Sequence, residues 1–242
     1  MRRLLRSLRK LASSRTSRSF GSINFYRTSY FDARNRRLVE LCRAGNRQAI
    51  LDHLAAQDTG HPELFDDERF ENRFGMQEIR DRIRARGAKA RILDVACGNA
   101  DLLVRLHQDG HDVTGVDASP VRADANRSRI PRSIHAFAEE IPLPSDGFDC
   151  AIAQECLEHV MDLDKTLAEI RRLLRPGGTL FAQVPDGTFA DGVNHVRLFD
   201  GPTLWAVVDA AGLVVDSVER VPYLIGEEPH NLFVTAHEPP SS

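Results

Sequence analysis

The stretch ILDVACGNADLL, Ile92–Leu103, decides the fold of this 242-residue chain. It reads as an apolar strand, a tight turn with a single glycine, Gly98, and the opening of an amphipathic helix. A strand, a narrow turn and a helix in this order are typical of an α/β fold whose ligand lies beyond the carboxyl end of the strand. The stretch therefore predicts a ligand site at residues 96–101.

Short apolar runs and amphipathic stretches alternate from Arg91 to the C-terminus, as in a parallel sheet with helices on both faces. The connection PYLIGEEPHN is too turn-rich for a helix, so the last two strands should pair as an antiparallel hairpin. We expect an α/β fold with a Rossmann-like seven-stranded sheet, mostly parallel, with that hairpin at its C-terminal end. The expected strands lie near 91–96, 112–117, 133–137, 148–153, 178–184, 213–219 and 231–237, and the helices near 100–109, 119–128, 163–174 and 201–211.

The composition is that of one ordinary domain with an appendage, since 42% of the residues are hydrophobic. No run approaches the roughly 18 apolar residues that a membrane-spanning helix needs. The four cysteines have neither zinc-site nor disulfide-framework spacing, so we expect reduced thiols and a cytoplasmic protein.

The N-terminal arm differs in charge from the rest of the chain. Residues 1–31 carry eight arginines and lysines and no acid, so the remainder has a formal charge of −11 against −3 for the whole chain. Its leucines fall at helical spacing. Three interpretations stay open: a contact of residues 1–18 with an anionic membrane surface, an organelle-targeting segment, and a solvated arm. Helical patterns near 35–57 and 76–87 either cover the ligand or only cap the sheet.

Two features of the turn indicate the class of ligand. Asp117 ends the second strand nineteen residues after Gly98, where a carboxylate can accept hydrogen bonds from both hydroxyls of a ribose. The turn lacks the three glycines of a dinucleotide site, and Asp94 and Asp101, with no arginine in the loop, would repel a phosphate. Asp94 or Asp117 alone could cap a turn, but the joint spacing of these two acids around Gly98 favours a nucleoside ligand, and the acids around the turn suit one that carries positive charge.

Five segments carry a family resemblance: ILDVACGNADLL, VTGVDASP, AEEIPLPSDGFDCAIAQECLEHV, LRPGGTLFAQVP and HVRLFDGPTLWAVVDAAGL. With them the chain resembles a class I S-adenosylmethionine-dependent methyltransferase, and it is similar to the ubiquinone-pathway O-methyltransferases, from about residue 70 onward. The first motif of this family reads acid-x-Gly-x-Gly-x-Gly, so Ala96 and Ala100 replace two glycines. The resemblance implies a basic arm and helical cap at 1–62 and a methyltransferase domain at 63–242.

The resemblance also implies a set of residues that bind the cofactor, S-adenosyl-L-methionine. The family often has an acid one position before Ala138, where this chain has Phe137, so Ala138 or Glu139 would hold the adenine amino group. The implied contacts are Asp94, Ala96 and Gly98 with the methionine part, Asp117 with the ribose, Ala118, Ala138 and Glu139 with the adenine, and Gln154 with the ammonium group.

Catalytic candidates follow the fourth and fifth strands. Methyl transfer needs alignment of the reacting atoms, and it needs a base only when the acceptor is a hydroxyl. Glu158 and His159 in QECLEHV, with His195 in VNHVRLF, could supply that base at the mouth of the sheet.

The spacing Glu-x-x-Glu-His with a later histidine also resembles the metal-binding segment of RNA 3'-end 2'-O-methyltransferases. The same residues can cap a helix or line a pocket, and the acidic domain has no basic stripe for RNA. We therefore expect a small-molecule methyl acceptor, methylated at oxygen, with no metal and no nucleic-acid partner. The alternatives are that RNA enzyme, a non-catalytic module that binds S-adenosylmethionine, and a nicotinamide-dependent oxidoreductase.

Overall fold

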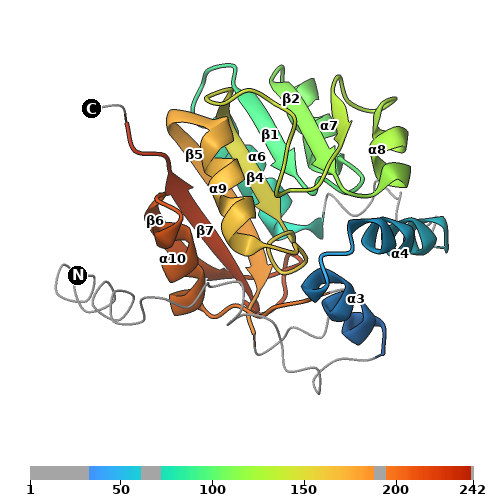
Figure 1. Cartoon of the computed structure of the whole chain (residues 1–242). Coiled ribbons are helices and arrows are strands. Elements are labelled where there is room, and N and C mark those ends of the chain that lie inside the picture. Colours follow the sequence, from blue (N-terminus) through green and yellow to red (C-terminus); the bar gives the residue numbers. More distant parts are fainter. Residues whose placement is uncertain (1–32, 61–71, 188–194, 241–242) are drawn as a thin grey trace.

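The computed structural model describes residues 33–60, 72–187 and 195–240. These residues form one seven-stranded sheet and the helices that pack around it (Figure 1). The strands stand in the order β3-β2-β1-β4-β5-β7-β6. Their bounds are β1 Arg91–Val95, β2 Asp112–Asp117, β3 Ser133–His135, β4 Phe148–Gln154, β5 Leu174–Pro185, β6 Val214–Val221 and β7 Asn231–His237.

The pairing of the strands confirms the predicted sheet. The neighbours from β3 to β5 are all parallel, with β1 between β2 and β4. β7 runs antiparallel to both β5 and β6, so the last two strands form the expected hairpin. The strand order reverses between β1 and β4, and this is the point where open α/β sheets bind their ligands.

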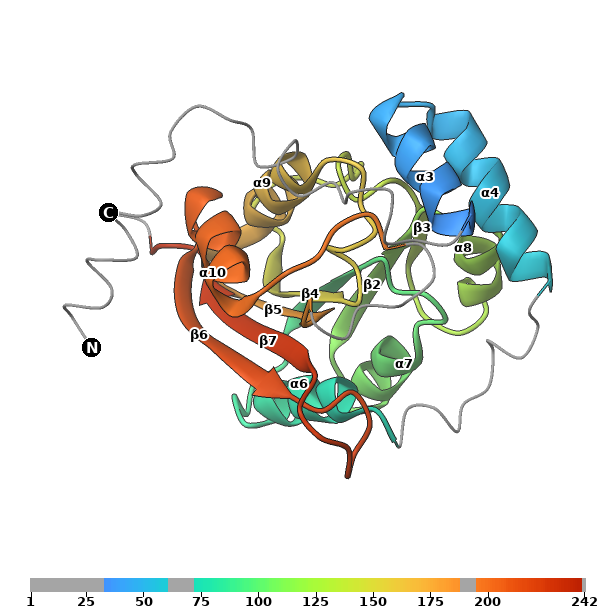
Figure 2. The same ribbon diagram turned by 90° about the horizontal axis from the view of Figure 1, so that it is seen from below.

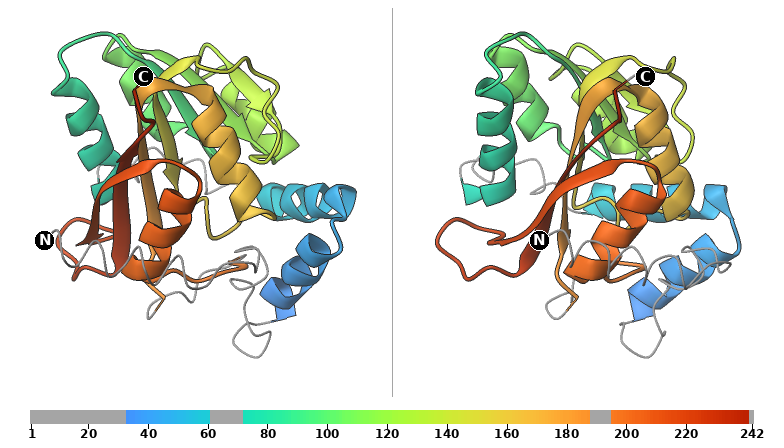
Figure 3. Two further views of the ribbon diagram at one scale, coloured as in Figure 1. Left: turned by 60° about the vertical axis from the view of Figure 1, so that its left-hand side comes forward. Right: turned by 90° about the vertical axis from the view of Figure 1, so that its left-hand side faces the viewer.

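Helices cover both faces of the sheet (Figures 2 and 3). α6 and α7 pack on one face through a cluster that includes Ile79, Leu103 and Leu106, whereas α9 and α10 pack on the other. The helix bounds are α3 Ala33–Arg43, α4 Arg47–Gly60, α6 Phe74–Arg84, α7 Asp101–Gln108, α8 Pro120–Asn126, α9 Leu163–Leu173 and α10 Gly201–Ala210.

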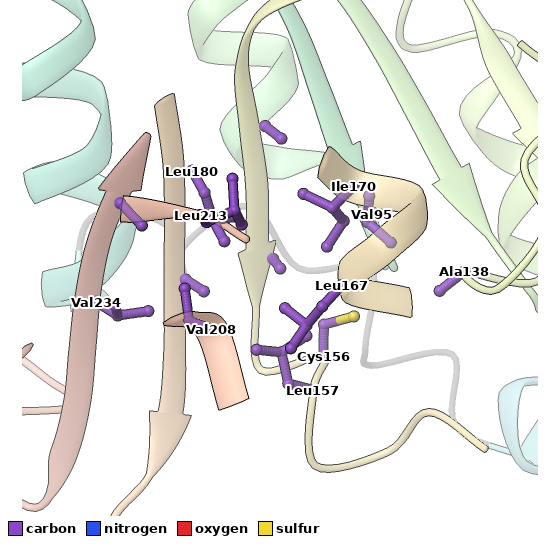
Figure 4. Packing of buried hydrophobic residues seen from close by; sticks show 14 of the residues in the cluster. Val95, Ala138, Cys156, Leu157, Leu167, Ile170, Leu180, Val208, Leu213 and Val234 are labelled. Atoms are coloured by element: carbon purple, nitrogen blue, oxygen red, sulfur yellow. The ribbon is translucent and has the colours of Figure 1, made fainter. Parts of the chain in front are cut away.

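The larger core lies between the sheet and helices α9 and α10 (Figure 4). Leu167 and Ile170 of α9 point toward the sheet, where Val95 and Leu180 are also completely buried. A fully buried aliphatic side chain stabilises a fold by about 1.5–3 kcal/mol, so this layer is a main source of the stability of the sheet.

Side-chain caps define where two helices begin at the carboxyl edge. The Ser119 hydroxyl accepts a hydrogen bond from the Arg122 N–H, and Pro120 occupies the first turn of α8. The Asp162 carboxylate likewise accepts from the Lys165 N–H at the start of α9. Both caps lie just after the loops that carry the predicted ligand and catalytic residues.

β5 is longer than the sequence predicts. The expected strand begins at residue 178, but the chain is extended from Leu174, directly after α9. Leu174 has ψ 135° and pairs with Phe148, so the helix ends before Pro176 and the strand already includes the Pro-Gly-Gly segment. Proline disfavours the helical conformation at the residue before it, Arg175, so the helix could not have continued beyond Leu174.

The α3–α4 hairpin packs over the carboxyl edge of the sheet. Leu38, Val39 and Ile50 form a buried cluster with Val196, and Phe137 packs against its margin. This arrangement agrees with a helical cap, although the assignment of residues 1–62 as a separate unit stays a prediction because residues 1–32 and 61–62 lie outside the described residues.

Gly115 in β2 provides a test of how tightly the fold supports the first turn. A methyl group at this position would lie 2.7 Å from the Cys97 sulfur, 2.9 Å from Ile130 Cδ1 and 3.0 Å from Leu103 Cδ1. We expect Gly115→Ala to lower the free energy of unfolding by about 1–3 kcal/mol, because a packed interior resists added volume. Urea unfolding measures this change.

Gly201→Ala is the matched control, since in the described part of the chain only Val218 Cγ1 lies within 4 Å of the added methyl, at 3.9 Å. Equal stabilities of the Gly115→Ala and Gly201→Ala variants would contradict the close packing at β2.

Candidate functional site

The turn after β1, residues 96–100, has the backbone of a glycine-rich loop. Ala96, Gly98 and Ala100 have φ angles of 59°, 55° and 59°. The left-handed region costs an L-residue other than glycine about 1–2 kcal/mol. Ala96 and Ala100 therefore hold the conformation that glycine would adopt freely, and we call this segment the β1–α7 turn.

The carboxylate of Asp117 ties the β1–α7 turn to the next strand. One oxygen accepts a hydrogen bond from the Gly98 N–H at 2.8 Å, and the other accepts from the Ser119 N–H at 2.8 Å. Ala118 lies between these two contacts, and its carbonyl is 3.1 Å from His135 Nε2. The predicted ribose acid thus lies directly beside the predicted turn.

Asp94 lies at the end of β1 and is 94% buried. Burial raises the pKa of Asp94 well above its ordinary value, and the neighbouring charge of Asp117 raises it further. A cation bound beside these two carboxylates would relieve that repulsion, so the pair favours a positively charged ligand.

The remaining predicted cofactor residues lie along the same edge. Ala138 is buried, and one oxygen of Glu139 accepts hydrogen bonds from the Met161 and Asp162 N–H groups at 2.8 and 3.0 Å. The Gln154 side chain points toward Gly75 at the start of α6, because a Cβ at Gly75 would lie 2.8 Å from its amide nitrogen. The role of each in binding stays a prediction.

Asp101 is not a free acid in the turn, as the sequence argument assumed. Its carboxylate pairs with the guanidinium of Arg129 at 2.9 Å, and the two side chains are 10% and 22% exposed. Arg129 lies 28 residues further along the chain, so no local spacing signals the pair. Of the acids near the turn, Asp94 and Asp117 would therefore contribute most of the repulsion of an anionic ligand.

The predicted catalytic residues converge into one cluster. A ligand-type atom from each of Glu158, His159 and His195 lies within 4.8 Å of the others. His159 Nε2 is 3.6 Å from Glu158 Oε1, and the two imidazole rings meet edge to face with centroids 4.9 Å apart. The histidine rings come from the loops after β4 and β5, as the sequence predicts.

Glu158 is a buried carboxyl group without a hydrogen-bond partner for either oxygen among the described residues. Burial raises its pKa well above the ordinary value, and Glu155 raises it further. Carboxylate and imidazole are ligands that divalent cations accept, so the Glu158–His159–His195 cluster could hold such an ion. The same cluster could also move a proton.

Arg197 is a site residue that sequence analysis missed. It is completely buried, and it donates to the carbonyls of Leu157 and Met161 at 2.7 and 3.2 Å. The Val196 N–H donates to the Glu158 carbonyl at 2.8 Å. The segment after His195 therefore holds both ends of the loop that carries Glu158 and His159.

Glu155 has hydrogen-bond partners outside this cluster, although only two residues separate it from Glu158. It has φ 50°, and one oxygen accepts from Asn231 Nδ2 at 2.8 Å and Gln183 Nε2 at 3.3 Å. Burial raises the pKa of Glu155 to about 7, although Arg73 and the Gln183 hydrogen bond act in the opposite direction.

A separate cavity of about 340 Å³ lies at the opposite, amino-terminal edge of β1 and β2. Lys89, Arg91, His107 and His111 are among its lining residues. It contains none of the predicted site residues, so it does not contribute to the site at the carboxyl edge.

No helix in the described part of the chain is both long enough and apolar enough to cross a membrane. The expected membrane contact of residues 1–18 lies outside the described residues and stays a prediction.

Comparison with known proteins identifies the family. Residues 93–182 match the family model described as a methyltransferase domain. The chain is 36% identical over 95 residues to an uncharacterized methyltransferase of Mycobacterium tuberculosis, covering 38% of this chain and 39% of that protein. It is 37% identical over 101 residues to a ubiquinone biosynthesis O-methyltransferase of Aromatoleum aromaticum, covering 39% and 43%.

A C-methyltransferase of ubiquinone and menaquinone biosynthesis from Vibrio cholerae is 32% identical over 105 residues, covering 37% of this chain and 39% of that protein. The chain thus spans about two fifths of the length of the curated relatives that it matches. Among solved structures, 1,6-didemethyltoxoflavin-N1-methyltransferase of Burkholderia thailandensis shares the fold, with a TM-score of 0.60, 24% identity and coverage of 78% and 89%.

The match begins at β1 and ends in β5, so it includes the β1–α7 turn, Asp117 and the loop of Glu158 and His159. Residues 93–182 therefore belong to a class I S-adenosylmethionine-dependent methyltransferase domain, a family in which S-adenosylmethionine is the methyl donor.

Proposed function

We propose that this protein transfers the methyl group of S-adenosylmethionine to an oxygen of a small-molecule acceptor. The observation that carries the proposal is the buried Glu158 carboxyl beside His159 and His195, on the sheet edge that also holds the β1–α7 turn. The methyl donor and the proton acceptor would then both lie at the carboxyl edge of the sheet. The matched relatives methylate carbon as well as oxygen by name, so the acceptor atom is part of the proposal.

In this proposal the cofactor lies along the ends of β1, β2 and β4. Asp117 holds the ribose, while Asp94 and the backbone of Ala96 and Gly98 follow the methionine part. Ala118, Ala138 and Glu139 surround the adenine, and the Gln154 carbonyl faces the ammonium group. Support comes from the buried acids of the first two strands, which suit a ligand with positive sulfur and nitrogen.

His159 is the proposed general base. It is 34% exposed on its side chain, whereas Glu158 is 1% exposed, so a substrate can reach the imidazole while the carboxyl stays behind it. A hydroxyl acceptor gives its proton to His159 as its oxygen attacks the methyl carbon. Glu158 then stabilises the imidazolium, and His195 fixes the orientation of the ring.

The alternative with a divalent cation rests on the same cluster. Glu158, His159 and His195 would hold the ion, which would lower the pKa of the acceptor hydroxyl. An RNA acceptor finds no support in the formal charge of −11 outside residues 1–31. A non-catalytic module that binds the cofactor would retain Asp117 but show no turnover. The cytoplasmic location stays a prediction.

The first test concerns the cofactor. Asp117→Asn removes the negative charge but keeps the shape of the side chain, and we expect it to weaken binding of S-adenosylhomocysteine tenfold or more. Isothermal titration measures the affinity, with NAD as a ligand control. Asp124→Asn, at an exposed position of α8, should bind as the unmodified chain does. Equal affinity of the Asp117 and Asp124 variants would contradict the ribose assignment.

The second test concerns the base. His159→Ala should lower turnover by about 10²–10⁴, the usual contribution of a general base, and leave the affinity for S-adenosylhomocysteine within about twofold. A panel of small phenols and catechols supplies the acceptor, and NMR of the product locates the methyl group. His107→Ala, in the opposite-edge cavity, is the control. Methylation at carbon, or loss of cofactor affinity with turnover, would argue against this role.

The same assays with magnesium and with EDTA separate the two forms of the mechanism. Turnover that is equal in both supports His159 as a base without a metal, whereas turnover abolished by EDTA and restored by magnesium favours the metal-assisted alternative.

The third test uses the pH dependence of stability. Because the native pKa of Glu155 is raised to about 7, its protonated form stabilises the fold below its ordinary pKa of 4.5, and that stabilisation is lost as the pH rises through 7. The shift corresponds to about 3 kcal/mol. Glu155→Gln, which cannot ionise, should therefore gain stability relative to the unmodified chain between pH 5 and pH 8.

Urea unfolding at four pH values measures the difference, and Glu140→Gln, whose side chain is 77% exposed, serves as control. Parallel stability curves for Glu155→Gln and the unmodified chain would show that the Glu155 carboxyl has an ordinary pKa.

A further inference from the structure

The β1–α7 turn has glycine geometry at two alanines, and its own hydrogen bonds provide only part of the restraint. The Cys97 N–H donates to the Val116 carbonyl at 3.0 Å, and the Ala100 N–H donates to the Cys97 carbonyl at 2.8 Å. The Gly98 N–H donates to Asp117, so these three contacts give acceptors to the N–H groups of Cys97, Gly98 and Ala100. The carbonyls of Gly98 and Asn99 need other partners if the turn is to keep its left-handed residues.

Two side chains from α8 and the segment after it bind those carbonyls. Asn126 is completely buried, and its amide nitrogen donates to the Gly98 carbonyl at 2.8 Å. The guanidinium of Arg129 donates to the Asn99 carbonyl and, with another nitrogen, to the Asp101 carboxylate at 2.9 Å. The carbonyls of Gly98 and Asn99 are thus both bound by side chains of α8 and the segment after it.

The hydrogen bond to the Gly98 carbonyl also sets the direction of the Asn99 N–H, because both belong to one planar peptide group. In a trans peptide the carbonyl and the following N–H point in opposite directions, and the described chain has no cis peptide bond. The Gly98 carbonyl faces Asn126, so the Asn99 N–H is directed away from α8. That N–H has no backbone partner among the described residues.

We propose that Asn126 and Arg129 are positioning residues that keep the β1–α7 turn in its ligand-binding conformation. Glycines at positions 96 and 100 would need less of this restraint, because glycine adopts positive φ without strain. This inference rests on the proposed binding of S-adenosylmethionine and adds to it the two side chains that shape the site. The two act through the carbonyls of Gly98 and Asn99 and through Asp101.

Rescue by glycine distinguishes positioning from direct contact with the ligand. Arg129→Ala should weaken binding of S-adenosylhomocysteine tenfold or more in isothermal titration. The same substitution in a chain with Ala96→Gly and Ala100→Gly should weaken it threefold or less, because glycine adopts positive φ without strain. The two glycines alone should change the affinity less than threefold.

Arg127→Ala is the matched control, since Arg127 is two residues away, exposed, and paired with Asp124 at 3.1 Å. It should leave binding unchanged in both backgrounds. Asn126→Ala provides an independent variant that should repeat the pattern of Arg129→Ala if the latter does not fold. Circular dichroism establishes the folding of each.

An equal loss of affinity in the alanine and glycine backgrounds would overturn the proposal, and so would unchanged affinity of Arg129→Ala. Hydrogen exchange of the Ala100 N–H gives a readout that needs no ligand, with faster exchange expected in Arg129→Ala. If the unmodified chain binds no S-adenosylhomocysteine, the proposed function fails. Unaltered exchange in Arg129→Ala then contradicts the positioning role separately.

Discussion

One carboxylate, that of Asp117, fixes the edge of the sheet on which the site depends. Parallel strands end side by side but are joined only through distant crossovers, so the loops at their ends need contacts of their own. Asp117 supplies two, to the Gly98 and Ser119 N–H groups, and thereby connects the turn after β1 with the start of α8. Asn126 and Arg129 extend that connection to the carbonyls of the same turn.

The electrostatics of the site follow from burial. Asp94 and Glu158 are buried and Glu155 is half-buried, and desolvation raises the pKa of all three carboxyl groups. A group of this kind is protonated more easily than in water unless a cation lies beside it. In the proposed function the sulfonium and ammonium of S-adenosylmethionine supply that charge next to Asp94. Burial raises the pKa of the Cys156 thiol, and the charges of Glu158, Asp94, Glu139 and Asp117 raise it further.

The sequence was sufficient to predict the sheet, and the residues that it proposed for the site lie along the carboxyl edge of that sheet. Alternating apolar runs indicated all seven strands, and the Gly98 turn with Asp117 indicated the ligand edge, because these signals are local. The contributions of Arg129 and Arg197 could not be predicted, since each binds carbonyls 30 or more residues away. The positive φ of Glu155 could not be predicted either, because a residue other than glycine rarely adopts it.

The α3–α4 hairpin illustrates how a covering element is attached. Leu38, Val39 and Ile50 bury apolar surface against Val196, while the Arg47–Glu140 ion pair has side chains 47% and 77% exposed. An exposed pair adds little, so apolar burial dominates the attachment. Docking of the hairpin therefore has a negative heat-capacity change and is driven by entropy near room temperature. The docking free energy of the hairpin becomes less favourable on cooling, whereas changes in ionic strength affect it only slightly.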